Sequence, residues 1–89
     1  MSTRTDRITA TLTAALSPTQ LVVRDDTRLH HGHTGVAPGQ TETHYHIEIT
    51  AEAFAGKNRV ESHRIVNALL QKEFELGLHA LSLLIRSPN

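Results

Sequence analysis

The chain has 89 residues, with nine basic and nine acidic side chains and no cysteine. That length allows one small domain, close to the lower limit at which a single hydrophobic core is stable without help. The lack of cysteine excludes disulfides and thiolate metal sites, and the neutral net charge provides no global field to attract nucleic acid or an anionic membrane. No run of 18 apolar residues is present, so we predict no transmembrane span and no membrane partner. Seven histidines are the compositional anomaly, and three of them lie within residues 30–33.

Residues 3–16 have the spacing of an amphipathic helix. Its apolar face consists of Ile8, Leu12, Ala15 and Leu16. Thr3 and Asp6 can cap the start of this helix, and Pro18 ends it. The helical pattern and the acidic residue argue against a transit peptide, and we therefore expect a cytoplasmic protein.

Two strands are predicted next, separated by a long loop. The β-branched run at residues 21–23 is the first, and residues 44–50 are the second. The second run alternates in the manner of a strand with one exposed face, on which His44, His46 and Glu48 lie. We interpret these three as an exposed face rather than a metal site, because nothing supplies a third and fourth ligand. Residues 27–42 have no pattern, which indicates a functional or disordered loop.

A short helical turn at residues 50–54, capped by Thr50, should precede the best-formed helix of the chain. Asn58 and Glu61 form a capping-box pair at the start of that helix, and Gly77 is placed to end it. Its apolar face consists of Val66, Leu69, Leu70 and Phe74, widened by Ile65 and Leu76. Residues 78–85 are predicted as the last strand, with residues 87–89 as a tail.

The order of these elements is helix, strand, strand, short helix, long helix, strand. Such an order predicts an α+β domain with two layers, in which helices cover one face of a three-stranded sheet. We expect residues 1–89 to form one domain and the free protein to be a monomer.

Several motifs, taken in their order and spacing, resemble those of the BolA family. They are Phe54-x-Gly56, His63-Arg64-x-Val66, Gly77-Leu78-His79-Ala80-Leu81, Thr43-His44-Tyr45 and the run at residues 22–26. The chain departs from the family pattern at Ser62, where members usually carry an arginine. The resemblance covers nearly the whole chain and implies the class II KH-like fold, with the order αββααβ.

The resemblance also implies an iron–sulfur role. His79 matches the histidine assigned as a cluster ligand in BolA–glutaredoxin complexes, although the residues alone favour a structural histidine near a helix end. The family takes its second ligand from the loop between the first two strands, which here indicates His33, with His31 or His30 as alternatives. The alternative that this loop is solvated and its histidines have no function stays open. The chain would then share a [2Fe-2S] cluster with a monothiol glutaredoxin and glutathione, in cluster trafficking and iron homeostasis or a related stress response.

A second candidate surface consists of Lys57, Arg59, His63 and Arg64. Residues 56–59 occupy the turn where KH domains carry their Gly-x-x-Gly clamp, but the second glycine is replaced by Arg59. The cations near a helix N-terminus can bind phosphate, which supports DNA binding and transcription regulation as an alternative function. Other interpretations also stay open. Arg64 could be a solvated surface residue and His63 a packing residue, and the protein could be an adaptor that binds no metal. The sequence contains no Walker loop, dinucleotide fingerprint or nucleophile–base pair, so we predict no enzymatic activity.

Overall fold

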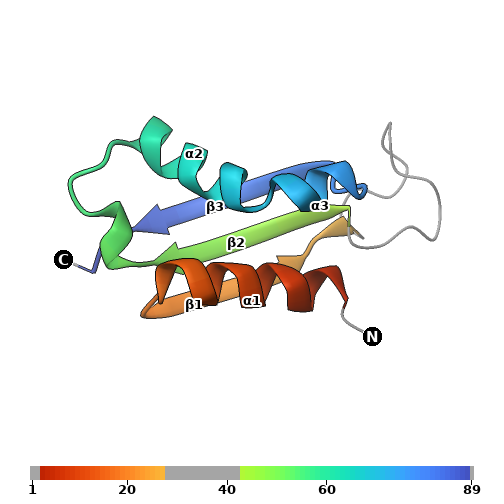
Figure 1. Ribbon diagram of the computed structural model, residues 1–89, viewed down its shortest axis with the longest axis horizontal. Helices are drawn as coiled ribbons and strands as arrows, with labels where there is room; N and C mark the ends of the chain where they lie inside the picture. Colours follow the sequence, from red (N-terminus) through yellow and green to blue (C-terminus); the bar gives the residue numbers. More distant parts are fainter. Residues whose placement is uncertain (1–2, 28–42, 89) are drawn as a thin grey trace.

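The computed structural model describes residues 3–27 and 43–88, which form a sheet and a layer of helices on one of its faces (Figure 1). The sheet has three strands in the order β1-β2-β3. In chain order the elements are α1 (Arg4–Leu16), β1 (Gln20–Asp25), β2 (His44–Thr50), the 3-10 helix η2 (Glu52–Phe54), α2 (Arg59–Leu69), α3 (Gln71–Glu75) and β3 (Ala80–Arg86). The predicted α+β class and the order of elements are confirmed.

The sheet combines both kinds of strand pairing. β1 runs antiparallel to β2, whereas β3 runs parallel to it, so the chain must cross back over the sheet between β2 and β3. The segment from η2 to α3 makes this crossover. Alternate residues of β2 are buried against the helices, as predicted for Tyr45, Ile47 and Ile49. Among the described residues, the buried hydrophobic core consists of Ile8, Leu12, Tyr45, Ile47, Ile49, Ala51, Phe54, Val66, Leu70 and Leu78.

Local capping signals fix the starts of the two main helices as predicted. The Thr3 side chain accepts from the Asp6 backbone N–H at 3.1 Å, and the Asp6 carboxylate accepts in return from the Thr3 N–H. Asn58 and Glu61 form the same reciprocal pair at the start of α2, with distances of 2.8 and 3.1 Å. Each pair satisfies backbone donors that a helix start otherwise leaves unpaired.

The prediction of one uninterrupted helix up to Gly77 is wrong. The helix breaks at Leu70, whose φ of −101° and ψ of 11° separate α2 from α3. The side chain of Leu70 is 1% exposed, and Glu73 in the following turn is also buried. The tertiary packing of these two residues therefore outweighs the helical continuity that the local sequence favours. Leu76, expected to widen the apolar face, is 54% exposed.

The predicted end at Gly77 is confirmed. Gly77 has a φ of +117°, a conformation that strains residues with a side chain. The Leu78 N–H donates to the Glu73 carbonyl at 2.9 Å and the Gly77 N–H to the Phe74 carbonyl at 3.3 Å. These two bonds satisfy the last carbonyls of α3 in the Schellman arrangement.

Three other predicted boundaries need correction. Thr50 does not cap a helix, because it is the last residue of β2; the residue before η2 is Ala51, which makes no side-chain cap bond. β1 is longer than residues 21–23, since cross-strand pairing with β2 extends it to both sides. β3 begins at Ala80 rather than at residue 78, which leaves His79 just outside the strand. The predicted loop beyond Thr27 lies outside the described residues.

Candidate functional site

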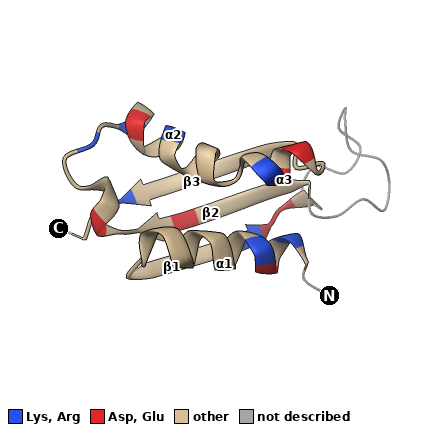
Figure 2. Cartoon of the chain, viewed as in Figure 1, with Lys and Arg blue, Asp and Glu red and all other residues tan. Residues whose placement is uncertain are grey.

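Two candidate sites lie at opposite ends of β3. His79 precedes its first residue, and Arg86 is its last. Seven residues of parallel strand place these ends about 20 Å apart. Many of the charged residues lie toward the two ends of the molecule (Figure 2). We name the first site, formed by Thr27, Thr43, His44 and His79, the histidine end.

At the histidine end, the backbone of His79 is held while its side chain is exposed. Its N–H donates to the Thr43 carbonyl at 2.8 Å, and the Ala80 N–H donates to the same carbonyl at 3.2 Å. The residue itself is exposed to solvent. A fixed backbone with an accessible imidazole is what a metal ligand shared with a partner requires.

A second imidazole lies beside the first, which sequence analysis did not predict. The rings of His44 and His79 meet edge to face, with their centroids 5.7 Å apart and an interplanar angle of 78°. The Nδ1 atom of His44 lies 3.0 Å from the Thr43 hydroxyl oxygen. The contact arises because β2 and β3 are parallel and His44 aligns with Ala80. The alternation of β2 alone could not reveal that register.

Buried threonines support this end of the sheet. The Thr27 hydroxyl oxygen, which is fully buried, accepts from the backbone N–H groups of Thr43 and His44 at 3.0 and 3.1 Å. The same hydroxyl donates to the Asp25 carboxylate. Thr27 therefore connects the end of β1 with the start of β2. Thr43, which Thr27 holds in place, in turn accepts the hydrogen bond from the His79 N–H.

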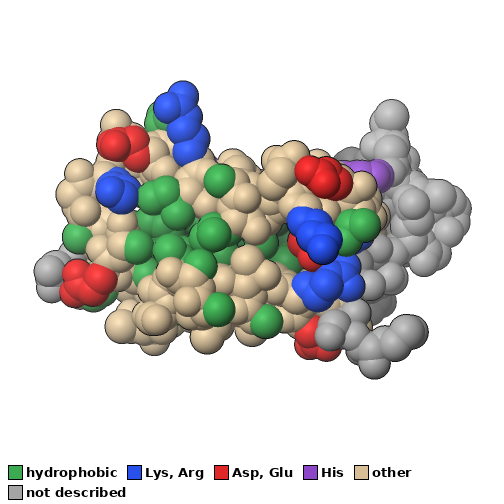
Figure 3. Space-filling view, in the orientation of Figure 1, with side chains coloured by type: hydrophobic (Ala, Val, Ile, Leu, Met, Phe, Trp, Pro, Cys, Tyr) green, Lys and Arg blue, Asp and Glu red, His purple; other side chains and the backbone are tan. Residues whose placement is uncertain are grey.

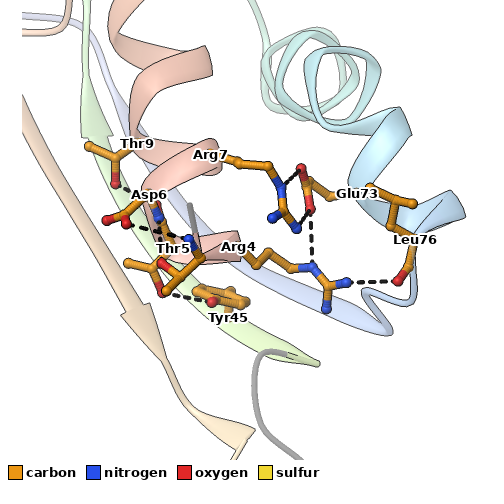
Figure 4. A network of polar contacts seen from close by, with 9 residues as sticks. Arg4, Thr5, Asp6, Arg7, Thr9, Tyr45, Glu73 and Leu76 are labelled. Atoms are coloured by element: carbon orange, nitrogen blue, oxygen red, sulfur yellow. Dashed lines mark hydrogen bonds and ion pairs between the residues drawn. The ribbon is translucent and has the colours of Figure 1, made fainter. Parts of the chain in front are cut away.

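An ion-pair cluster ties α1 to α3 on the helix side (Figure 4). Arg7 donates to both oxygens of Glu73 at 2.9 Å, and Arg4 donates to one of them at 3.1 Å. Arg4 also donates to the Leu76 carbonyl at 2.8 Å. The hydrogen bond from Arg7 lowers the pKa of the Glu73 carboxyl most, with Arg4 adding to it, while burial opposes the shift.

Sequence analysis did not predict this ion-pair cluster, although the sequence contains a signal for it. Arg4 and Arg7 are three residues apart and so share a helix face. Glu73 falls among the apolar positions of the predicted long helix, where a lone acid needs a partner.

The second site is a groove of about 460 Å³, which we name the basic groove. It lies between η2, the start of α2 and the C-terminal half of β3. The lining residues are Phe54, Lys57, Asn58, Arg59, Ser62, His63, Leu83, Leu84, Ile85, Arg86 and Ser87. The predicted residues Lys57, Arg59 and His63 thus come together, joined by Arg86, which sequence analysis did not single out. Arg64 is exposed and is not part of the lining.

The face of the molecule that carries the helices also shows a band of hydrophobic side chains between α1 and α2 (Figure 3). Near its end toward α3 lies a hollow of about 370 Å³, lined by Arg7, Ala10, Thr11, Leu69, Leu70, Lys72, Glu73 and Leu76. The exposed Leu76 belongs to this hollow rather than to the core.

On the face of the sheet opposite the helices, His46 links two polar residues. Its Nε2 lies 3.0 Å from the Glu48 carboxylate, and its Nδ1 lies 3.1 Å from the Ser82 hydroxyl oxygen. Serine, histidine and acid are the residue types of a hydrolase triad, but catalysis also needs a shielded site with donors for the oxyanion. Ser82 is exposed and the Glu48 side chain is 43% exposed, so we interpret the three as a polar network of this face.

The remaining predictions concern metal sites and the membrane. In residues 3–27 and 43–88, no group of three or more histidine, cysteine, aspartate or glutamate side chains could hold a metal ion. His30, His31 and His33 lie outside this part of the chain, and their role as ligands stays a prediction. None of the helices in the described ranges is long and apolar enough to span a membrane.

Known proteins resemble this chain in sequence. A family model described as BolA-like protein matches residues 12–89. The UV-induced protein uvi31 of Schizosaccharomyces pombe is 40% identical over 82 residues, which cover 90% of this chain and 80% of that protein. The chloroplastic protein BOLA1 of Arabidopsis thaliana is 40% identical over 88 residues, covering 97% of this chain and 54% of the relative. SufE-like protein 1 of the same plant, named chloroplastic/mitochondrial, is also 40% identical, over 91 residues. This chain spans 24% of that protein, against about half of BOLA1.

Solved structures show the same architecture. The BolA domain of SufE1 from Arabidopsis thaliana superimposes with a TM-score of 0.88 at 39% identity. BolA1 from the same plant gives a TM-score of 0.86 at 34% identity. Each comparison covers 99% of this chain and 95% of the other. The fold expected from the motifs is therefore confirmed.

Proposed function

This chain belongs to the BolA family, and on that premise we propose that it is a non-enzymatic partner of a monothiol glutaredoxin, with which it shares a [2Fe-2S] cluster. The observation that supports this most is the placement of His79, whose backbone is fixed by Thr43 and whose side chain is exposed. The chain has no cysteine, so the glutaredoxin and glutathione supply the thiolates. This chain supplies imidazole from His79 and from a loop histidine, His33 or else His31 or His30.

The exchange of thiolate for imidazole changes the charge and the reduction potential of the shared cluster. A neutral ligand in place of an anionic one removes negative charge from the cluster and raises its reduction potential. Such a cluster suits transfer to a recipient or the sensing of iron supply, which is the role we assign to the complex. The cytoplasmic location expected from the sequence stays part of this proposal.

The test is reconstitution of the purified chain with a monothiol glutaredoxin, glutathione, iron and sulfide. Visible absorption and circular dichroism should differ from those of the glutaredoxin homodimer. We expect His79→Ala to restore the homodimer spectrum, and His33→Ala to do the same if it is the second ligand. His46→Ala is the matched control, because His46 bonds to Glu48 and Ser82 on the face of the sheet opposite the helices. An unchanged spectrum in His79→Ala would refute the assignment of this ligand.

The basic groove favours a second candidate function, the binding of DNA through its phosphates. Lys57, Arg59 and Arg86 line one hollow beside the start of α2, although the net charge of the chain is zero. Cations that neutralise phosphates release counterions, so binding weakens as salt increases.

Titration of a short DNA duplex at several salt concentrations tests this function. Loss of one phosphate contact in Lys57→Ala or Arg59→Ala should reduce the slope of log affinity against log salt by about 1. Lys72→Ala removes an exposed cation of α3 outside the groove and should leave the slope unchanged. Equal slopes in the groove variants and in this control would exclude the groove as the DNA site.

A further inference from the structure

β3 forms one edge of the sheet and pairs with β2 on one side. The two ends of the strand show which of its residues face β2. The Ala80 N–H donates to the Thr43 carbonyl at 3.2 Å, and the Arg86 carbonyl accepts from the Ala51 N–H at 3.1 Å. The backbone groups of successive strand residues point to opposite sides, so the even-numbered residues of β3 face β2 and the odd-numbered ones face outward.

The outward-facing backbone groups belong to Leu81, Leu83 and Ile85. In the described part of the chain, these residues make no backbone–backbone hydrogen bond with any element other than β2. An unpaired strand edge is a template for the addition of another strand. β3 therefore offers free N–H and carbonyl groups to an extended segment.

The basic groove runs along this edge. Consecutive residues 83–87 form one of its walls, and the turn before α2 and the start of α2 form the other. Consecutive residues lie on alternate faces of a strand, so the edge of β3, rather than one of its faces, lines the groove. Extended peptides bind in this manner when they add to an exposed sheet edge.

The charges of the groove indicate what kind of segment fits it. Lys57, Arg59 and Arg86 are exposed, and within residues 3–27 and 43–88 none of them forms an ion pair. The lining contains no aspartate or glutamate. A second copy of β3 is a poor occupant, because that strand contains Arg86 and no acid and would bring like charges together.

We propose that the basic groove binds an extended acidic segment of a partner protein, which adds to the free edge of β3 as a fourth strand. The backbone of the segment pairs with Leu83 and Ile85. Its side chains alternate between the two faces of the sheet. On the helix side carboxylates meet Lys57 and Arg59, and on the other side apolar residues lie beside Leu84, which is 38% exposed.

This inference goes beyond the shared cluster and uses none of the histidines assigned to it. It also differs from DNA binding in the same groove. The phosphates of a duplex need only the cations, whereas an acidic segment uses the cations and the unpaired strand edge together. The unpaired edge therefore favours a peptide over DNA.

The test uses the full chain and a fluorescent peptide of about six residues, in which glutamate alternates with valine. Fluorescence anisotropy measures its affinity, and NMR measures amide hydrogen exchange. We expect the peptide to slow exchange at the Leu83 and Ile85 amides about tenfold or more, and to leave the amides of the other edge strand, β1, unchanged.

Two N-methylated peptides test strand addition itself. One is methylated at every glutamate amide and the other at every valine amide. Only one of these sets faces β3, so one peptide should bind as the parent peptide does and the other should lose binding. Equal affinities of the two would overturn the proposal.

Charge variants test the cations. At physiological salt, Lys57→Glu and Arg59→Glu should each weaken peptide binding about tenfold. Arg64→Glu is the matched control and should bind as the native chain does, since Arg64 is an exposed cation of the same helix outside the groove lining. Equal losses in the control and the groove variants would contradict the proposal.

The proposal is also overturned if the native chain does not bind the peptide, or binds it without protecting the Leu83 and Ile85 amides. Protection of these amides by a short DNA duplex but not by the peptide would assign the groove to DNA instead. Each of these results leaves the cluster function untouched, because that function is read from the spectrum of the glutaredoxin complex.

Discussion

The histidine end and the basic groove lie at opposite ends of one strand, yet they are built in different ways. At the histidine end, Thr27 and Thr43 are buried and Glu73 binds two arginines nearby on the helix side. At the groove, Lys57, Asn58 and Arg59 are all exposed. The turn that carries them includes Gly56, which has a φ of +75° and open space on the side where other residues carry their Cβ atom.

The difference matches the ligands proposed for the two sites, a metal cluster at the histidine end and a phosphate at the groove. A metal ligand must point in one direction, and that direction is set by the residues behind it. A phosphate can be bound by a long, flexible lysine as a point charge, so its position needs less support. We therefore expect substitutions behind the histidine end to cost more stability than comparable substitutions at the groove.

The largest effect is expected for Glu73→Ala. The substitution leaves Arg4 and Arg7 without their shared carboxylate and should lower the free energy of unfolding by about 3 kcal/mol. Urea unfolding followed by circular dichroism measures the change. Glu75→Ala on the same short helix removes an exposed acid and should stay within about 0.5 kcal/mol of the native chain. Similar losses in the two variants would contradict the assigned role of Glu73.

Thr27→Val tests the interior of the histidine end. Valine has the shape of threonine but cannot accept from the N–H groups of Thr43 and His44, and the unpaired buried donors should cost about 2 kcal/mol. The same unfolding assay applies, together with NMR contacts between the rings of His44 and His79. Thr19→Val is the control, since Thr19 is exposed and its hydroxyl makes only a 3.3 Å bond. A native-like stability of Thr27→Val would show that this network does not support the site.

A smaller effect is expected at the groove end for Asn58→Ala. It removes the cap from the start of α2 and should cost about 1 kcal/mol. Asn67→Ala, at an exposed position within the same helix, should be neutral or slightly stabilising because alanine is the better helix former. If Asn58→Ala destabilises the chain more than Thr27→Val does, the contrast between the two ends is wrong.

The smallest signal is the pH dependence that Glu73 contributes. Its pKa in the folded chain lies below the ordinary value of 4.5, so the unfolded chain binds the proton more readily. The stabilisation is fully present above that ordinary value and is lost as the pH falls through the lower, folded pKa. The gap in unfolding free energy between the native chain and Glu73→Gln should therefore narrow as the solution is acidified. A gap that stays constant with pH would show that the charge of Glu73 is not what stabilises the fold.

Sequence reasoning succeeded where the signal is local. The caps at Thr3 and Asn58, the end at Gly77 and the alternation of β2 each depend on residues within a few positions of one another. The break at Leu70 and the burial of Glu73 depend on packing against α1, which the local pattern does not contain.

The candidate sites followed the same division. Lys57, Arg59 and His63 line one groove because they are neighbours along one turn and helix, whereas Arg64, predicted with them, is not part of its lining. The contact of His44 with His79 depends on the register of two strands that are distant in sequence. Alternation within one strand indicates which face a residue occupies, but not which residue of another strand it meets.

The parallel pairing of β2 with β3 also has a kinetic consequence. Ala80 can align with His44 only after the whole crossover from η2 to α3 has returned the chain to the start of β2. Contacts of this kind carry a large loop-closure entropy and form slowly during folding. The two imidazoles are therefore far apart in the unfolded chain and meet at a late step. Their ring contact is for that reason a built-in reporter of completed folding.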